Sequence, residues 1–280
     1  MRIAHLSDFH FTKLTWNPFS LFPKRWLAQL NWVFNRDKEF SPTQVDPLPD
    51  LFQKLGLDFV LLGGDFTTTA LPQEFERAFT FTSKLRLPWI AIPGNHDNYT
   101  RESFAARRYY RYFPDEELAA NGVKAQKIGP NWWVIALDSS FPGSLVSSRG
   151  KFSPEREAHL RALLKKLSPD ASLLLFNHYP FFQNDAPHKI LERGDVLEQI
   201  VREDPRIRLY LHGHTHRNTL ADLQPSGYPI VLDSGSCTQG PQGSWNLIDL
   251  QETGCTVSVY RWNRQWYLSR TEHLTWRRNT

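Results

Sequence analysis

Five short motifs spread over the first 216 residues contain side chains that bind divalent cations. The motifs are Asp8-Phe9-His10, Gly64-Asp65, Gly94-Asn95-His96-Asp97, Asn177-His178 and Gly213-His214-Thr215-His216. Carboxylate, amide and imidazole groups are common ligands of such cations. Any one motif is a weak signal, because short strings of this kind also occur by chance in solvated loops. Their order along the chain is what indicates a common site.

Each motif follows a short apolar run that is typical of a buried strand. The runs are Arg2 to Leu6, Phe59 to Leu62, Trp89 to Ile92, Leu173 to Phe176 and Ile207 to Leu211. Ligands at the carboxyl ends of several strands in one α/β sheet meet at a single crevice. The sequence therefore predicts that the five motifs form one site.

The chemistry that suits such a site is hydrolysis of a phosphate ester. A pair of cations about 3.5–4 Å apart holds the attacking and leaving oxygens of an in-line displacement. One ligand must bridge the pair, and Asp65 is the natural bridge because a carboxylate has two oxygens. Asp8 and His10 are two residues apart, so both lie on the same side of an extended segment. His214 and His216 have the same spacing.

The motif series resembles the calcineurin-like metallophosphoesterase family, whose pattern is D-x-H, G-D, G-N-H-[DE], H and G-H-x-H. The resemblance covers Asp8 to His216. It implies a four-layer α/β/β/α sandwich of two mixed sheets. The implied ligands are Asp8, His10 and His216 for the first metal and Asn95, His178 and His214 for the second, with Asp65 shared.

His96 is left over from this ligand set. In the family, the histidine of G-N-H-[DE] protonates the leaving oxygen, and the resemblance implies the same role for His96. We expect the carboxylate of Asp97 to hydrogen-bond the His96 ring and to fix its tautomer. The alternative is that His96 is an ordinary surface-loop histidine.

The remaining titratable candidates are weaker. Asp138 follows a strand pattern at 132–137 and either supports the site or forms a turn. Five histidines are expected to be structural or solvated: His5, His159, His188, His212 and His273. His212 is the closest rival to the predicted ligands, because it is adjacent to Gly213.

The predicted cofactor is a pair of divalent metal ions. A ligand set without a thiolate argues against a structural zinc site. Oxygen-rich sets favour manganese, and iron or zinc are the other possible occupants.

The composition bounds the class of protein. A chain of 280 residues with 40% hydrophobic and 22% charged residues fits one globular domain, residues 1–280. A net charge of +4 suits an anionic substrate or membrane surface and is no footprint of nucleic acid binding. Two cysteines imply no disulfide framework and fit a reducing compartment. Without a signal-peptide pattern or an apolar run of about 18 residues, we expect a cytoplasmic location. Nothing implies a protein partner.

Helix and strand signals alternate through the first two thirds of the chain. We expect helices between 71 and 85, from Ser153 onward, and over about 188–202, and a hairpin of 124–127 with 132–137. Four short strand patterns follow residue 227: 228–232, 245–249, 256–262 and 265–271. We expect them to form an antiparallel set that closes the second sheet.

The segment 11–50 interrupts this alternation with an unusual number of aromatic and basic residues. Its candidate substrate-contacting residues are Trp16, Phe22, Arg25, Trp26, Leu30, Trp32, Phe34 and Arg36. Apolar residues recur along 26–34 at helical spacing, and Trp32 projects from the polar side with two arginines. A basic, aromatic amphipathic helix is typical of a membrane-interfacial element. We interpret the segment as a lid insertion, with a helix docked on the core as the alternative.

The substrate is then expected to be a lipid-linked pyrophosphate. Residues 66–69 lack the arginine that follows the Gly-Asp motif in protein phosphatases, which disfavours that activity. The chain also resembles the lipid-directed branch of the family, including UDP-2,3-diacylglucosamine pyrophosphatases of lipid A synthesis that carry G-N-H-D. That resemblance implies hydrolysis of UDP-2,3-diacylglucosamine to UMP and 2,3-diacylglucosamine 1-phosphate (lipid X) at the inner face of the cytoplasmic membrane. The alternatives are a cyclic-nucleotide or general phosphodiesterase and a non-catalytic scaffold.

The lid interpretation is testable. Replacing Trp26, Leu30 and Phe34 with serine should weaken vesicle binding and raise KM for a diacyl substrate, because interfacial affinity scales with buried apolar area. Hydrolysis of a small diester should change little. Vesicle sedimentation and steady-state kinetics measure both effects. Equal loss of both activities, or unfolding, would mean that the apolar residues pack in the core.

Overall fold

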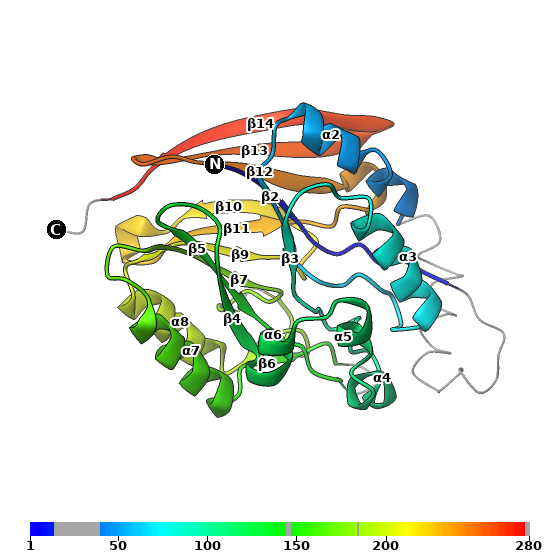
Figure 1. Cartoon of the computed structure of the whole chain (residues 1–280), viewed down its shortest axis with the longest axis horizontal. Coiled ribbons are helices and arrows are strands. Elements are labelled where there is room, and N and C mark those ends of the chain that lie inside the picture. Colours follow the sequence, from blue (N-terminus) through cyan, green and yellow to red (C-terminus); the bar gives the residue numbers. More distant parts are fainter. Residues whose placement is uncertain (14–39, 144–146, 184, 278–280) are drawn as a thin grey trace.

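Two six-stranded mixed sheets form the centre of the computed structural model, which describes residues 1–13, 40–143, 147–183 and 185–277 (Figure 1). The first sheet contains β1 (Arg2–Leu6), β2 (Phe59–Leu62), β3 (Trp89–Ala91), β12 (Ser244–Leu250), β13 (Gly254–Asn263) and β14 (Gln265–Thr275). Its order is β14-β13-β12-β1-β2-β3. β1, β2 and β3 are parallel, whereas β12, β13 and β14 are antiparallel to their neighbours.

The second sheet has a parallel centre and antiparallel edges. Its strands are β4 (Val123–Lys127), β5 (Trp132–Leu137), β7 (Ser172–Asn177), β9 (Ile207–His212), β10 (Asn218–Asp222) and β11 (Ile230–Ser234). The order is β10-β11-β9-β7-β5-β4, and β5, β7, β9 and β11 run parallel. β4 and β5 form the expected hairpin.

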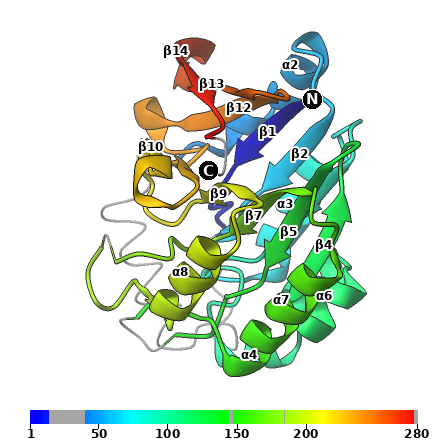
Figure 2. The same cartoon turned by 90° about the vertical axis from the view of Figure 1, so that its left-hand side faces the viewer.

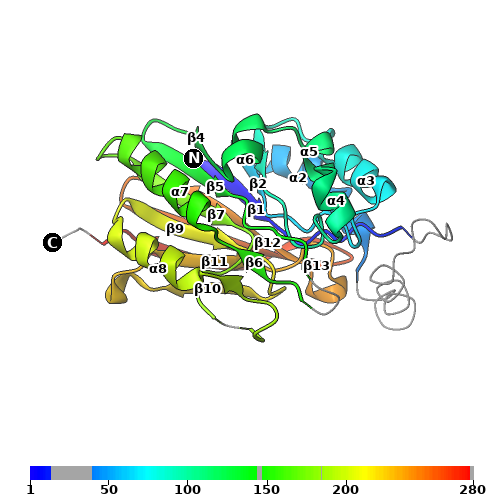
Figure 3. The same cartoon turned by 90° about the horizontal axis from the view of Figure 1, so that it is seen from below.

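Helices cover the outer face of each sheet (Figures 2 and 3). α2 (Leu48–Lys54) and α3 (Pro72–Thr82) pack on the first sheet, and α7 (Pro154–Lys166) and α8 (Gly194–Glu203) on the second. Shorter elements complete the described chain: η3 (Pro42–Val45), α4 (Arg101–Ala105), α5 (Arg108–Tyr112), α6 (Glu116–Asn121), β6 (Gly150–Lys151), β8 (Leu191–Glu192), η4 (Gln224–Ser226) and η5 (Gly240–Gln242). The four-layer α/β/β/α sandwich is confirmed.

Three buried apolar clusters match these layers. Between the sheets, Leu61 and Ile248 pack with Leu174 and Leu209. One outer cluster joins α2 and α3 to the first sheet, and the other joins α7 and α8 to the second. The strands that precede the motifs are therefore held from both sides, which fixes the positions of their carboxyl ends.

Two predicted elements differ from the structure. The helix expected over 188–202 begins at Gly194, because Leu191–Glu192 pair with β6 as β8 and Arg193 takes a left-handed conformation with φ 60°. The last strands do not form one antiparallel set. β11 pairs parallel to β9 in the second sheet, and β12 joins β13 and β14 to β1 in the first.

Both described ends of the predicted insertion, residues 11–50, belong to the folded domain. Phe11 is buried and bridges Thr67, and Phe40 is buried and bridges Gln239. η3 and the first turn of α2 also lie within the predicted range. The eight candidate lid residues between 16 and 36 lie outside the described residues. None of the described helices combines the length and hydropathy that crossing a bilayer requires.

The inter-sheet core predicts a large cost for a cavity at Leu174. This side chain is 0% exposed on β7, so Leu174→Ala should lower the free energy of unfolding by about 2–5 kcal/mol. Leu268→Ala, at a position 52% exposed on β14, is the matched control and should have little effect. Urea denaturation measures both, and equal effects would contradict the assignment of the core.

Candidate metal centre

The structure places the seven candidate ligands at the carboxyl ends of five strands. Asp8 and His10 follow β1, Asp65 follows β2, Asn95 follows β3, His178 follows β7, and His214 and His216 follow β9. The first three strands belong to one sheet and the last two to the other. The site therefore lies at the edge where the carboxyl ends of strands from both sheets come together, as the order of the motifs predicts.

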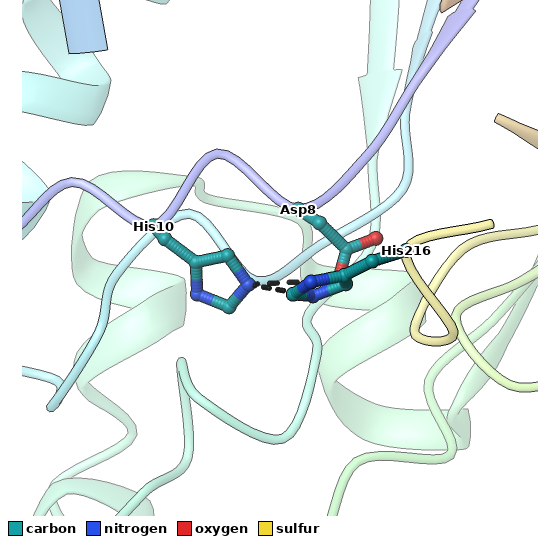
Figure 4. A group of neighbouring side chains, drawn as sticks. All are labelled: Asp8, His10 and His216. Atoms are coloured by element: carbon teal, nitrogen blue, oxygen red, sulfur yellow. Dashed lines mark hydrogen bonds and ion pairs between the residues drawn. The ribbon is translucent and has the colours of Figure 1, made fainter. Parts of the chain in front are cut away.

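The first group of ligand atoms belongs to Asp8, His10 and His216, which point toward one another (Figure 4). Their ligand atoms all lie within 4.8 Å of one another. The Nε2 atoms of His10 and His216 are 3.0 Å apart, and Nε2 of His216 is 3.2 Å from Oδ1 of Asp8. Ligand atoms about 2.1 Å from an octahedral cation are separated by roughly 3 Å, so this spacing suits a metal.

The second group contains Asp65, His178 and His214. Oδ2 of Asp65 is 3.4 Å from Nε2 of His178 and 4.0 Å from Nε2 of His10. Asp65 therefore lies between the two groups, where a bridging ligand must be.

Backbone carbonyls orient two of the histidine rings. Nδ1 of His178 is 2.7 Å from the carbonyl oxygen of Gly63, and Nε2 of His214 is 2.9 Å from that of Lys189. A carbonyl oxygen only accepts, so these nitrogens carry a proton, and the opposite nitrogen of each ring is the one that can present a lone pair to a metal. His178 would bind through Nε2 and His214 through Nδ1.

The backbone is strained at the candidate ligands. Among the described residues, nine non-glycine residues have positive φ, and five of them are Asp8, His10, Asp65, His214 and His216, with φ of 57°, 46°, 53°, 68° and 56°. This left-handed region costs roughly 1–2 kcal/mol for a residue with a Cβ atom. Strain concentrated on one set of residues is typical of a functional site.

Two glycines allow the close approach of the loops. A Cβ atom on Gly94 would lie 2.1 Å from Oδ1 of Asp65, and one on Gly213 would lie 2.0 Å from Oγ of Ser7 and 2.5 Å from Oδ2 of Asp8. Only glycine fits at these positions, because any side chain would displace a candidate ligand.

Electrostatics fit a cation-binding centre. Burial alone would raise the pKa of Asp8 and Asp65, but neighbouring histidines hold both pKa values below the ordinary range. Burial would lower the pKa of His178, but the carboxylate of Asp65 raises it to about 9. Burial and the charge of His178 lower the pKa of His214 to about 3, so this ring is neutral at pH 7 and can donate a lone pair.

Three buried ligand-type atoms test whether metal ions fit. Oδ1 of Asp8, Oδ1 of Asn95 and Nε2 of His178 form no hydrogen bond of good geometry within the described part of the chain, and the first and third have only ion-pair contacts, with His216 and Asp65. Buried polar atoms are rarely left unpaired, because desolvation is costly. Two cations would satisfy all three, so the residues present fit a two-metal centre.

Comparison with known proteins agrees with this geometry. The model of the calcineurin-like phosphoesterase family matches residues 1–218. The chain belongs to this family.

Individual relatives are similar over most of the phosphoesterase. A probable cyclic nucleotide phosphodiesterase of Synechococcus sp. is 27% identical over 217 residues, covering 73% of this chain and 76% of that protein. A 3',5'-cyclic adenosine monophosphate phosphodiesterase of Pseudomonas aeruginosa is 26% identical, covering 74% and 70%. A probable glycerophosphodiester phosphodiesterase of Arcobacter nitrofigilis is 28% identical over 57% of each chain. The crystal structure of a dimetal phosphatase from Danio rerio has the same fold, with a TM-score of 0.72, 14% identity and 99% of each chain covered.

His96 of this phosphoesterase lies beside the candidate ligands. A ring nitrogen of His96 lies within 4.8 Å of a ring nitrogen of His10 and of a carboxylate oxygen of Asp65. The backbone N–H of His96 donates to Oδ1 of Asp65 at 2.8 Å. The ring stacks on Tyr99 with centroids 5.5 Å apart. His96 is therefore part of the site and not an isolated loop histidine.

The expected role of Asp97 needs correction. Nδ1 of the His96 ring lies 2.7 Å from the carbonyl oxygen of Thr68, so this carbonyl orients the ring. The Asp97 carboxylate instead accepts from the backbone N–H of Thr67 at 2.9 Å and of Gly94 at 3.0 Å. Asp97 thus joins the loops after β2 and β3. Its buried carboxylate is surrounded by four donors, the backbone N–H groups of Phe66, Thr67 and Gly94 and the hydroxyl of Thr67, and it pairs with these instead of with the ring.

Other residues surround the site without joining the ligand groups. His212 is buried, and its Nδ1 lies 3.0 Å from the carbonyl oxygen of Gly213 and 3.5 Å from Oδ2 of Asp233. Asp233 in turn accepts from the hydroxyl of Thr215, between the two ligand histidines, a support that the sequence analysis missed. Asp138 accepts from the hydroxyl of Tyr110 and caps Ser140, so it acts as a turn former.

The bridging position of Asp65 gives a direct prediction. Asp65→Asn should reduce bound metal and bring turnover to background, because a neutral amide weakens both groups at once. Elemental analysis and phosphodiester hydrolysis measure the two effects. Asp170→Asn, at an exposed position, is the control and should retain both. Two metal ions and an unchanged rate in Asp65→Asn would contradict the bridge.

Proposed function

We propose that this phosphoesterase is a two-metal phosphodiesterase that hydrolyses small phosphodiesters such as cyclic nucleotides or glycerophosphodiesters. The observation that carries the proposal is the pair of ligand groups that meet at Asp65, with His96 beside them. The names of three similar proteins, all phosphodiesterases, support the substrate class. A scaffold role is disfavoured, because every candidate ligand position holds a ligand-type side chain.

Each residue has a defined part in the proposed reaction. When bound, a pair of divalent cations makes a water molecule more acidic and neutralises charge on the phosphoryl oxygens. Asp8, His10 and His216 would hold one cation, and Asn95, His178 and His214 the other, with Asp65 shared. Manganese is the proposed metal, with iron or zinc as alternatives, because the ligands mix carboxylate, amide and imidazole groups.

His96 is the proposed general acid. Its Nδ1 carries the proton that is donated to the carbonyl oxygen of Thr68, so Nε2 is the nitrogen that can exchange a proton with a substrate. A proton delivered to the leaving oxygen completes cleavage of the ester bond.

The second candidate substrate is UDP-2,3-diacylglucosamine, cleaved at its pyrophosphate by the same residues. A specific observation favours it: the segment expected to contact a lipid begins and ends at the metal centre. Thr12 and Lys13 lie just beyond His10, and the ring of Phe40 is 4.7 Å from that of His10 and 5.6 Å from that of His216. For this candidate we propose peripheral binding to the anionic inner face of the cytoplasmic membrane.

A substrate comparison separates the two candidates. We expect metal-dependent release of product from 3',5'-cyclic AMP, a glycerophosphodiester or a bis-aryl phosphodiester, with UDP-2,3-diacylglucosamine in detergent micelles measured in parallel. A kcat/KM at least about 10² higher for the lipid would establish the second candidate. Hydrolysis of phosphomonoesters alone would contradict both.

The general-acid role predicts a dependence on the leaving group. His96→Ala should lower kcat by about 10²–10⁴ for an alkyl leaving group and much less for p-nitrophenolate, which leaves without protonation. Bound metal should stay unchanged. His159→Ala, on the exposed face of α7, is the control and should retain activity. An equal loss for both leaving groups would show that His96 only positions the substrate.

A further inference from the structure

Glu74 is a buried carboxylate that the proposed chemistry does not use. It lies in the first turn of α3 and is 0% exposed. Its oxygens accept from the backbone N–H of Thr69 at 2.9 Å, of Leu71 at 3.0 Å and of Lys13 at 3.2 Å. They also accept from the hydroxyl of Thr69 at 3.1 Å. One side chain therefore fixes the loop that links the Gly-Asp motif to α3.

This loop needs such an anchor. Ala70 has φ 58°, a left-handed conformation that is unfavourable for a residue with a Cβ atom. The two residues on either side of it, Thr69 and Leu71, are the ones whose N–H groups donate to Glu74. Without the carboxylate, two buried N–H groups would lose their acceptor, and the loop would move to pair them elsewhere.

The same loop holds His96 on two sides. The carbonyl oxygen of Thr68 accepts from Nδ1 of the ring at 2.7 Å, and Oγ1 of Thr67 donates to the backbone carbonyl of His96 at 2.9 Å. Thr68 is directly adjacent to Thr69 in the chain. A shift of the loop at Thr69 therefore changes where the Thr68 carbonyl points and how the ring is oriented.

We propose that Glu74 is a positioning residue for His96, acting through the carbonyl of Thr68. The inference rests on the proposed function, because it assumes that His96 protonates the leaving group. The hydrogen bonds that the Glu74 carboxylate accepts come from Lys13, Thr69 and Leu71, none of which is a candidate metal ligand. Glu74 sets the ring orientation on which efficient proton transfer depends.

Glu74→Gln is the direct test. Glutamine has nearly the same shape but only one acceptor oxygen, so its NH₂ group must face either the N–H donors of Thr69 and Leu71 or the N–H donor of Lys13. Burial raises the pKa of Glu74 to about 7, so kinetics above that pH compare glutamine with a charged carboxylate. Glu76→Gln, at an exposed position of the same helix, is the matched control.

The expected result is a selective loss. Glu74→Gln should lower kcat for an alkyl leaving group by about 10-fold or more, with KM and bound metal unchanged and little effect for p-nitrophenolate. In a His96→Ala background the same change should cost less than about 2-fold, because the group it positions is absent. Glu76→Gln should be silent in both backgrounds.

Any other outcome contradicts either the positioning role of Glu74 or the general-acid role of His96. Additive losses of Glu74→Gln and His96→Ala, or equal losses for both leaving groups, would show that Glu74 only stabilises the fold. If His96→Ala itself shows no leaving-group dependence, the proposed general acid is wrong, whatever Glu74 does. If Glu74→Gln folds poorly, Glu74→Asp, which keeps the charge one methylene shorter, is held to the same criteria.

Discussion

Two buried carboxylates at the ends of adjacent parallel strands are the constraint on which the rest of the site depends. Asp8 and Asp65 follow β1 and β2, and both are almost completely buried. Like charges in a poorly solvated site repel each other, and each loses its hydration. Such a pair is stable only with positive charge beside it. In the structure, His178 provides part of that charge, because the carboxylate of Asp65 raises its pKa to about 9. Two divalent cations would provide it more fully.

The fold holds this unfavourable arrangement through its rigid surroundings. The candidate ligands adopt left-handed backbone conformations, and Gly94 and Gly213 allow contacts that no side chain would permit. Tightly packed strands on both faces keep these loops from relaxing. Strain of this kind persists when the surrounding structure determines the conformation. The packing therefore holds the candidate ligands in one defined arrangement.

The sequence was sufficient for the architecture of the site because each motif stands directly after an apolar run. Strand ends such as Leu6 and Leu62 are visible as the last residue of such a run, and parallel strands bring their ends together. Which strands are neighbours in a sheet is harder to predict from the sequence. Alternation identified 228–232 as a strand, but it does not show that β11 pairs with β9 and not with β12.

The contacts that orient the histidine rings could not be predicted, because they are backbone carbonyls. Gly63, Thr68 and Lys189 place carbonyl oxygens against His178, His96 and His214, and nothing in their side chains indicates it. Asp97 was expected to hydrogen-bond the ring of His96, but its buried carboxylate accepts from the backbone N–H groups of Thr67 and Gly94. The substrate-contacting role of residues 16–36 stays a prediction.

Anomalous diffraction from crystals grown with Mn²⁺ would test the central claim most directly. We expect two peaks about 3.5–4 Å apart, one beside Asp8, His10 and His216 and one beside Asn95, His178 and His214. Both peaks should contact the Asp65 carboxylate, and neither should be ligated by His96. A single peak, or two peaks that do not share Asp65, would contradict the two-metal centre.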